Sequence, residues 1–312
     1  MKEAEYLVTG GAGFIGANLT ARLVDGGKSV RVLDNLATGR KENLDPLLDR
    51  IDFVEGDIRD AETVGRAVEG THCIFHLAAL PSVPRSIEEP VETCEVNSVG
   101  TLRVLEAARK SGSERIVFSS SSSVYGDTDE LPKREDMIPR PISPYAIQKF
   151  TGECYMKQYF QLYGLKTFSL RYFNVFGPMQ NPASRYAAVI PLFINALFEG
   201  KAPVVHGDGL QTRDFTFVDN VVEANLACAG APAKAAGKVY NVACGGRTGI
   251  LELASTLARI MKKEITPVHD DPRPGDVRDS EGDIAKAGKL LDWKPKVDLE
   301  EGLKRTVQWH KG

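Results

Sequence analysis

A tyrosine and a lysine four positions apart are the first residues of this sequence that could do chemistry together. Tyr145 and Lys149 lie in "PISPYAIQKFTGE", where Ser143 can cap a helix and Pro144 suits its first turn. Helical residues at this spacing share one face. An ammonium beside a phenol would lower the pKa of the tyrosine and give a base near neutral pH. The spacing alone also fits an ordinary surface pair.

A run of serines follows the apolar segment "RIVF" and opens the stretch "SSSSSVYGDT", from Ser119 to Thr128. Serine-rich stretches can form flexible linkers. Here the preceding apolar residues predict a buried strand, and open α/β sheets bind ligands at the carboxyl ends of their strands. The position of the serines therefore favours a site over a linker.

Glycines near the N-terminus form a second motif, in "LVTGGAGFIGANLTARLV". Gly11, Gly13 and Gly16 fit G-x-G-x-x-G between an expected strand and an expected helix. Glycines there permit a tight turn, close approach of a pyrophosphate and packing of the helix on the strand. The helix N-terminus would then face the phosphates.

Asp34 ends the next apolar run, "SVRVLD", 18 positions after Gly16. A carboxylate there can accept hydrogen bonds from ribose hydroxyls and would repel a 2′-phosphate, so the pattern predicts NAD rather than NADP. Asp57 in "GDIRD" is a candidate adenine contact. The alternative is that the glycines only form a turn and that Asp34 only caps a loop.

The elements that must position these residues follow from the order of the apolar runs. Short runs rich in Val, Ile and Phe alternate with helix-length stretches, which predicts parallel strands joined by right-handed crossovers. The expected fold class is α/β, a Rossmann-type doubly wound parallel sheet with a smaller, discontinuous α/β substrate domain. Strands are expected at "YLVTG", "SVRVLD", "DFVEGD", "HCIFHLAA", "RIVFSS" and "TFSLRY".

The regular alternation ends after about residue 175. We expect residues 1–175 to form an NAD-binding domain and residues 176–312 to form mainly a substrate-binding domain. A segment at about 212–240 is a candidate for returning to the first domain, because "DFTFVDNVVEANLACAG" fits a strand followed by a helix.

Composition limits the class of protein. Of the 312 residues, 42% are hydrophobic and 26% are charged, which is typical of a globular chain. The net charge of -3 gives no basic surface for nucleic acid. The N-terminus lacks the apolar core of a signal peptide and no run could span a bilayer, so we expect no membrane partner and a cytoplasmic location.

The cysteines and histidines show no metal-site spacing. The five cysteines lack C-x-x-C pairs, so we expect reduced, buried thiols and no metal site. His76 is expected in the core at a strand end.

With these motifs in order, the sequence resembles the extended short-chain dehydrogenase/reductases, and within them the UDP-hexose 4-epimerases, especially those acting on N-acetylated sugars. The resemblance covers essentially the whole chain. It implies a UDP-sugar substrate, an NAD that stays bound, and a homodimer formed by helices near 97–110 and 143–162. It rests on "TGGAGFIG", "DNLATG", "GDIRD", "HLAAL", "SVPRS", "SSSSSVYGD", "SPYAIQK", "RYFNVFGP", "GDGLQTRDFTFVDN" and "RPGDVRDS".

The resemblance also implies catalytic roles. Ser121 matches a Ser or Thr that hydrogen-bonds the sugar 4-hydroxyl, and Tyr145 with Lys149 matches the acid–base pair. Ser122 and Ser123 stand where related 4,6-dehydratases carry Asp and Glu, which favours epimerisation over elimination of water. The implied reaction oxidises C4 to a ketone, turns the sugar and reduces its other face, with no net redox change.

The remaining contacts are carried over position by position. Cofactor contacts are expected at Gly10, Gly13, Phe14, Ile15, Asp34, Asn35, Thr38, Gly39, Asp57, Ile58, Leu77, Ala78, Ala79, Asn97, Tyr145, Lys149 and Tyr172. Substrate contacts are expected at Ser82, Val83, Arg85, Ser121, Ser122, Tyr145, Asn174, Ala188, Val189, His206, Arg213, Arg273, Asp276 and Ser280. Among these, Arg213 and Arg273 match the diphosphate contacts and Asp276 the ribose contact. Pro81 replaces a lysine that contacts the cofactor in many UDP-galactose epimerases.

Ser280 matches a position where epimerases restricted to glucose and galactose carry a tyrosine. A serine leaves room for an N-acetyl group beside the sugar. We therefore expect UDP-N-acetylglucosamine and UDP-N-acetylgalactosamine to be preferred and UDP-glucose and UDP-galactose to be accepted. The alternative is that Ser280 lies in a loop away from the sugar.

Other functions remain open. The chain could be a UDP-glucose 4-epimerase proper, another NAD-dependent nucleotide-sugar reductase or dehydratase of the same fold, or a non-catalytic NAD-binding regulator. The Tyr145 and Lys149 pair speaks against the regulator, and Ser122 with Ser123 speaks against the dehydratase.

Overall fold

A parallel sheet forms the centre of the computed structural model, which describes residues 3–182, 188–264, 266–271 and 277–311. Within these residues the sheet is 7-stranded in the order β11-β6-β5-β4-β1-β2-β3, and every pairing is parallel. This confirms the predicted fold class and the expected strands. The strands are β1 (Tyr6–Thr9), β2 (Val30–Asp34), β3 (Asp52–Glu55), β4 (Cys73–His76), β5 (Arg115–Ser121), β6 (Lys166–Tyr172) and β11 (Lys238–Val242).

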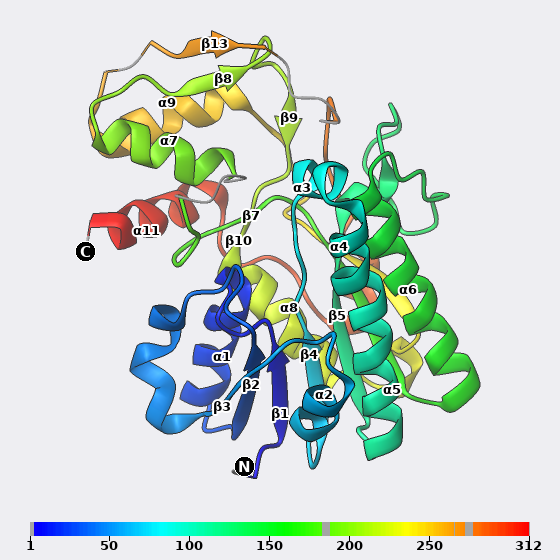
Figure 1. Cartoon of the computed structure of the whole chain (residues 1–312). Coiled ribbons are helices and arrows are strands. Elements are labelled where there is room, and N and C mark those ends of the chain that lie inside the picture. The colour runs from blue at the N-terminus through cyan, green and yellow to red at the C-terminus, as the bar shows by residue number, and fades with distance from the viewer. Residues whose placement is uncertain (1–2, 183–187, 265, 272–276, 312) are drawn as a thin grey trace.

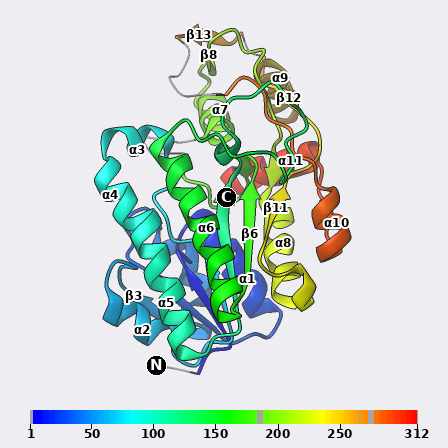
Figure 2. The same cartoon turned by 90° about the vertical axis from the view of Figure 1, so that its right-hand side faces the viewer.

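Helices cover both faces of the sheet, as Figures 1 and 2 show. Successive strand residues point to opposite faces, so Val8 joins one apolar cluster and Leu7 the other. Each such side chain, when fully buried, contributes about 1.5–3 kcal/mol. One cluster packs under α1 (Phe14–Asp25) and α8 (Val218–Gly230), and the other under α2 (Ala61–Val68), α5 (Thr101–Ser111) and α6 (Pro144–Tyr163).

The chain after β6 builds an outer lobe beyond the carboxyl ends of the strands (Figure 1). Its short strands pair locally, β13 with β8, β12 with β9 and β10 with β7. Helix α9 packs against both α7 and α11. The elements are β7 (Val175–Phe176), α7 (Val189–Phe198), β8 (Val204–His206), β9 (Thr212–Arg213), β10 (Thr216–Phe217), β12 (Thr248–Gly249), α9 (Ile250–Met261), β13 (Val268–Asp270) and α11 (Leu299–Lys311). Helix α10 (Ala285–Leu291) instead packs against β11 and α8 (Figure 2).

Part of the later chain packs on the central sheet. Helix α8 contacts α1, and β11 pairs with β6 at the sheet edge. The division into an NAD-binding part and a substrate-binding part stays a prediction, because it concerns what each part binds. Two short helices, α3 (Val83–Glu88) and α4 (Pro90–Cys94), follow β4. Short 3-10 or π segments lie at Lys41–Arg50, Glu95–Gly100, Ser122–Tyr125 and Ala233–Ala235.

His76 and the cysteines test the predictions made for the core. His76 is fully buried between the hydroxyls of Thr9 at 2.8 Å and Thr101 at 2.9 Å, which places it in the core as expected. The five thiols are free. The prediction of burial holds for Cys73 and Cys228, whereas Cys244 is partly buried and the prediction is wrong for the exposed Cys94 and Cys154. Among the described helices, none is both long and apolar enough to cross a membrane.

Candidate active site

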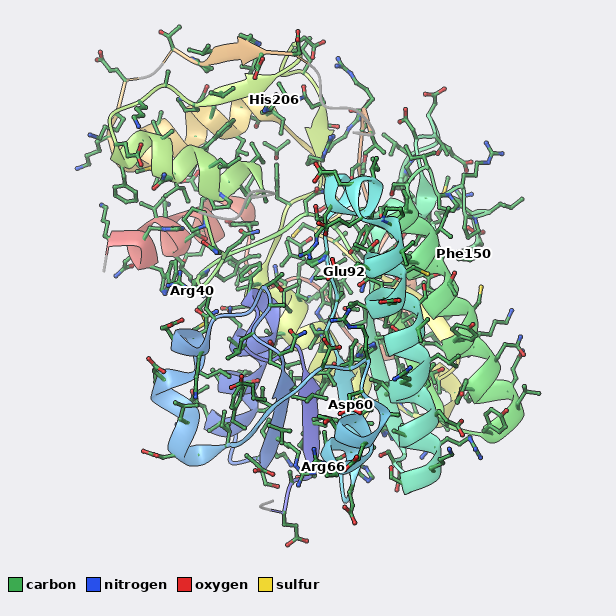
Figure 3. The ribbon with its side chains drawn as sticks, in the orientation of Figure 1. Arg40, Asp60, Arg66, Glu92, Phe150 and His206 are labelled. Carbon is green, nitrogen blue, oxygen red and sulfur yellow. The ribbon has the colours of Figure 1, made fainter. Side chains whose placement is uncertain are left out.

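A cavity of about 830 Å³ lies where the carboxyl ends of the strands meet the outer lobe. Its wall combines Asp34 and Ser121 from the sheet with Arg213 from the later chain. Figure 3 labels Arg40 and Glu92, which also line it. The strand ends therefore border a space large enough for a ligand, at the edge where open α/β sheets bind theirs.

Most of the predicted site residues line this cavity. The candidate catalytic residues there are Ser121, Ser122, Ser123, Tyr145 and Lys149. The candidate cofactor residues there are Gly10, Gly13, Phe14, Ile15, Asp34, Asn35, Thr38, Gly39, Asp57, Ile58, Leu77, Ala78, Ala79 and Tyr172. The candidate substrate residues there are Ser82, Val83, Arg85, Asn174, Ala188, Arg213 and Ser280. Their individual roles stay predictions.

Asn97 is not brought to the cavity wall. It is buried and holds Leu80 through two hydrogen bonds, from its amide to the Leu80 carbonyl at 3.2 Å and from the Leu80 N–H at 2.8 Å. Because Leu80 lines the cavity, Asn97 supports the wall rather than forming it.

Two predicted substrate contacts within the described residues, Val189 and His206, do not line the cavity. Val189 begins α7, one residue beyond the cavity-lining Ala188. His206 lies on β8 in the outer lobe (Figure 3) and is not among the residues that line the cavity. Arg273 and Asp276 lie outside the described residues.

The glycine motif forms a cradle at the start of α1. A Cβ on Gly16 would lie 2.1 Å from the carbonyl oxygen of Gly10, so only glycine fits there. The turn itself is made by Gly10, whose φ is 72°, and not by Gly11; a Cβ on Gly11 would instead meet Val32 at 2.6 Å. Gly13 precedes the first N–H groups of α1 at the cavity wall, where a helix N-terminus favours phosphate.

Asp34 is prepared to accept hydrogen bonds from a ligand. Its Oδ2 accepts from the N–H of Ala12 at 2.9 Å and its Oδ1 from that of Leu36 at 2.8 Å. Burial raises the pKa of Asp34, and these two bonds lower it in part. Each carboxylate oxygen has a second lone pair for a ribose hydroxyl, whereas a 2′-phosphate would meet like charge. The glycine cradle and Asp34 together fit NAD.

Asp57 lines the cavity beside Asn35. It accepts from Arg59 Nη2 and Asn35 Nδ2, each at 2.8 Å, and the Arg59 hydrogen bonds hold its pKa down to about 2. Arg59 and Arg40 also line the cavity, and the sequence motifs did not identify them. Arg59 directly follows "GDI", so its place in that motif was the available signal.

Helix α6 begins as predicted. Ser143 accepts a hydrogen bond from the N–H of Ala146 at 3.2 Å, and Pro144 occupies the first turn. The N–H of Tyr145, in the first turn where helical partners are missing, donates to Ser86 Oγ at 3.0 Å. The cap therefore fixes the start of the helix that carries the candidate base.

The electrostatics of Tyr145 and Lys149 differ from the expectation. Burial raises the pKa of Tyr145 to about 12, and a hydrogen bond with Ser121 lowers it in part. Lys149 donates to the Ser119 carbonyl at 2.7 Å, and its Nζ lies 5.9 Å from the centroid of the Tyr145 ring. Burial lowers the pKa of Lys149 to about 7. In the protein chain without a ligand, Lys149 is not among the groups that shift the pKa of Tyr145, and the predicted effect of Lys149 together with NAD stays a prediction.

The serine run is ordered, and the linker interpretation is wrong. Ser120 donates to Glu153 at 2.5 Å, and Glu153 forms a buried ion pair with Arg171 at 2.7 Å. Ser121 Oγ accepts from Ser123 Oγ at 2.9 Å at the cavity wall. The sheet and α6 thus hold the serines in fixed positions.

The substrate end carries Ser280 at the cavity wall. Ser280 is buried and its Oγ accepts from Asn174 Nδ2 at 3.4 Å, so it does not lie in a displaced loop. Lys133 and Gln180 line the same cavity, and no sequence motif pointed to them. Within the described residues, Gln180 Oε1 is buried with no hydrogen-bond partner, which leaves an acceptor for a ligand.

Comparison with known proteins places this fold and site in a family. Residues 6–243 match the model of the NAD dependent epimerase/dehydratase family, and the chain belongs to this family. It is 43% identical to a UDP-glucose 4-epimerase of Mycolicibacterium smegmatis over 97% of both chains. It is 35% identical to a UDP-glucuronate 4-epimerase of Thermodesulfobacterium geofontis, over 98% of this chain and 96% of that relative.

Solved structures agree with this assignment. The UDP-glucose 4-epimerase of Thermotoga maritima, solved with UDP-glucose, matches with a TM-score of 0.93 and 40% identity over 98% of each chain. The UDP-N-acetylglucosamine 4-epimerase of Methanobrevibacter ruminantium, in complex with UDP-N-acetylmuramic acid, matches with a TM-score of 0.94 and 38% identity over 100% of this chain and 99% of its own. Family membership and these relatives confirm the resemblance, the isomerase class and NAD as the cofactor.

Proposed function

We propose that the protein is a UDP-hexose 4-epimerase that interconverts UDP-N-acetylglucosamine and UDP-N-acetylgalactosamine and also accepts UDP-glucose and UDP-galactose. The observation that carries the proposal is the neighbourhood of Tyr145. Its hydroxyl interacts with Ser121, and Ser280 lies on the wall of the same cavity. An acid–base group, a hydroxyl and room beside the sugar are what this reaction needs.

In this proposal Tyr145 removes the proton of the sugar 4-hydroxyl during oxidation and returns it during reduction. NAD, when bound, supplies the chemistry of accepting a hydride from C4 and giving it back. With a pKa of about 12, Tyr145 holds its proton in the free chain, so it becomes a base only when positive charge is near its oxygen. Lys149 Nζ is fixed on the Ser119 carbonyl and lies 5.9 Å from the centroid of the Tyr145 ring, and we propose that its ammonium supplies part of that charge when NAD is bound.

Epimerisation is favoured over dehydration by the residues next to Ser121. Elimination of water across C5 and C6 needs a general acid and a general base. Ser122 and Ser123 line the cavity at that point, and a serine hydroxyl of ordinary acidity does neither task near neutral pH. Oxidation at C4 followed by reduction needs only Tyr145, Ser121 and the cofactor.

The UDP part must stay anchored while the sugar turns, and Arg213 is the proposed anchor. Its Nη1 donates to the carbonyls of Thr212 at 2.8 Å and Arg278 at 3.2 Å, which fixes the guanidinium at the cavity wall. A guanidinium binds phosphate oxygens in a fork. Arg273 and Asp276 are proposed as further contacts on the resemblance alone.

We also propose a homodimer through the outer face of α5 and α6, which lie side by side in Figure 2. Exposed apolar side chains lie on α6 and on α4, which packs against α6, with Val91 71%, Ile147 52% and Leu162 67% exposed. Exposed apolar surface of this kind favours an interface. Light scattering is expected to give twice the 34.0 kDa of one chain, and a single-chain mass would contradict the dimer.

Two coarser assignments complete the proposal. Residues 1–175 hold NAD, residues 176–312 hold mainly the UDP-sugar, and the segment near 212–240 returns in part to the first domain. A cytoplasmic location is proposed because the free thiols suit a reducing compartment.

A cofactor-release assay tests the proposed function. The purified protein is denatured and its NAD is quantified, and native protein is incubated with UDP-N-acetylglucosamine without added cofactor. Stoichiometric NAD and formation of UDP-N-acetylgalactosamine are expected. A need for free NAD(P)H would identify a reductase, and a 4-keto-6-deoxy product would identify a dehydratase.

A further inference from the structure

A carboxylate outside the predicted set of site residues joins several segments behind the cavity wall. Asp214 is fully buried between β9 and β10. Its Oδ1 accepts from the N–H of Cys244 at 2.8 Å. Its Oδ2 accepts from the N–H of Gly245 at 3.0 Å and from that of Gly282 at 3.1 Å. A buried carboxylate is costly unless such donors satisfy it, so the segments that meet there depend on one another.

These segments carry the substrate end of the cavity. Arg213 directly precedes Asp214 in the chain, and Asn174 donates to the Asp214 carbonyl at 3.1 Å. Gly282 lies two residues beyond Ser280. Asp214 therefore helps to fix the segments that carry Arg213 and Ser280, the side chains proposed to contact the diphosphate and the sugar.

We propose that Asp214 is a positioning residue for the UDP-sugar, because it clamps the Cys244–Gly245 and Gly282 segments to the strand that carries Arg213. The inference rests on the proposed function. Asp214 is not among the residues that line the cavity, so it acts through its neighbours. Gly10 and Asp34 hold the cofactor end separately, so NAD retention does not depend on Asp214.

Calorimetric titration with UDP-glucose measures this positioning, because the UDP part is common to every candidate substrate. Asp214→Asn replaces one carboxylate oxygen by an NH2 group, which cannot accept a hydrogen bond from the backbone N–H that faces it. The clamp is therefore weakened, and we expect the Kd for UDP-glucose to rise about tenfold or more. Bound NAD per chain is expected to stay unchanged. A purely structural loss would lower the active fraction and leave the Kd of the folded protein as it was.

Asp208→Asn is the matched control. Asp208 is an exposed carboxylate that pairs with Arg278 at 2.8 Å, on the same segment as Ser280. Exposed pairs contribute little, so we expect its Kd to change by less than about threefold.

The wild type provides a second test through pH. Burial raises the pKa of Asp214 to about 6, so below that pH the folded chain takes up a proton there and loses an acceptor. Cys244, whose N–H donates to Asp214, carries a thiol whose pKa burial raises to about 11, so this thiol does not titrate over the same range. We expect the affinity for UDP-glucose to fall about fivefold or more from about pH 7 to about pH 5. Both phosphates of this probe are esterified and stay charged.

The outcomes separate the inference from the proposed function. A folded Asp214→Asn variant with the wild-type Kd, or a flat pH series in the wild type, would overturn the inference. If the variant does not fold, the pH series decides, and the Asp208→Asn control must keep the same fall in affinity. Wild-type protein that binds UDP-glucose without epimerising it would contradict the proposed function and leave the positioning role intact.

Discussion

The two ends of the cavity are held in different ways. At the cofactor end, Gly10 and Asp34 belong to β1, β2 and their loops, which pair along four residues of a buried sheet. At the substrate end, Asn174, Arg213 and Ser280 come from segments far apart in the chain, joined by scattered side-chain bonds and a few backbone bonds rather than by a continuous strand pairing. Substitutions at the first end should therefore disturb the sheet and cofactor retention. Substitutions at the second should change which sugar is bound while the fold survives.

The largest effect is expected where the two ends meet, at Tyr145. Tyr145→Phe removes the exchangeable proton, and we expect turnover to fall at least about a hundredfold while NAD content stays unchanged. Lys149→Ala is expected to lose activity on the same scale. Tyr163→Phe, at the exposed end of the same helix, is the control and should keep wild-type turnover. Near-normal turnover in Tyr145→Phe would remove the acid–base role.

A smaller effect is expected at the cofactor end. Gly16→Ala places a Cβ 2.1 Å from the Gly10 carbonyl oxygen, and relieving that overlap costs about 1–3 kcal/mol. We expect the NAD retained through purification to fall about tenfold, as measured by release from denatured protein. Gly65→Ala on α2 meets nothing within 4 Å and should retain NAD fully. If Gly16→Ala retained as much NAD as the wild type, the glycine cradle would have room for a Cβ and the proposed close fit would be wrong.

The smallest effect on the fold is expected at the substrate end. Ser280→Tyr fills the space beside the sugar, and we expect kcat/KM for the N-acetylated pair to fall about tenfold while the plain pair changes less than about threefold. NAD content and thermal stability should remain near wild type. Ser255→Tyr, on the exposed face of α9, controls for adding a tyrosine. Unchanged conversion of the N-acetylated pair would move the sugar specificity to other residues.

The same contrast explains what could be predicted from the sequence. The start of α6 at Ser143, the strand ending in Asp34 and the glycine cradle follow from spacing within short segments. Such patterns depend on local backbone geometry, which a sequence carries directly. The serine run could be placed at a strand end for the same reason.

What could not be predicted depends on packing between distant segments. His206 was expected at the cavity, but pairing of β8 with β13 places it in the outer lobe. The raised pKa of Tyr145 comes from burial, which no four-residue spacing records. Asp214 looked like one more charged residue after Arg213, because its donors come from segments 30 and 68 positions away.

The central claim is that C4 of the sugar is oxidised and reduced again by the same bound cofactor. The most direct measurement uses UDP-N-acetylglucosamine carrying deuterium at C4, incubated with the enzyme without added cofactor, followed by NMR of the product. We expect UDP-N-acetylgalactosamine with deuterium still at C4, because the hydride that leaves returns to the same carbon. Replacement of the deuterium by solvent hydrogen, or loss of it to added NAD⁺, would contradict the claim.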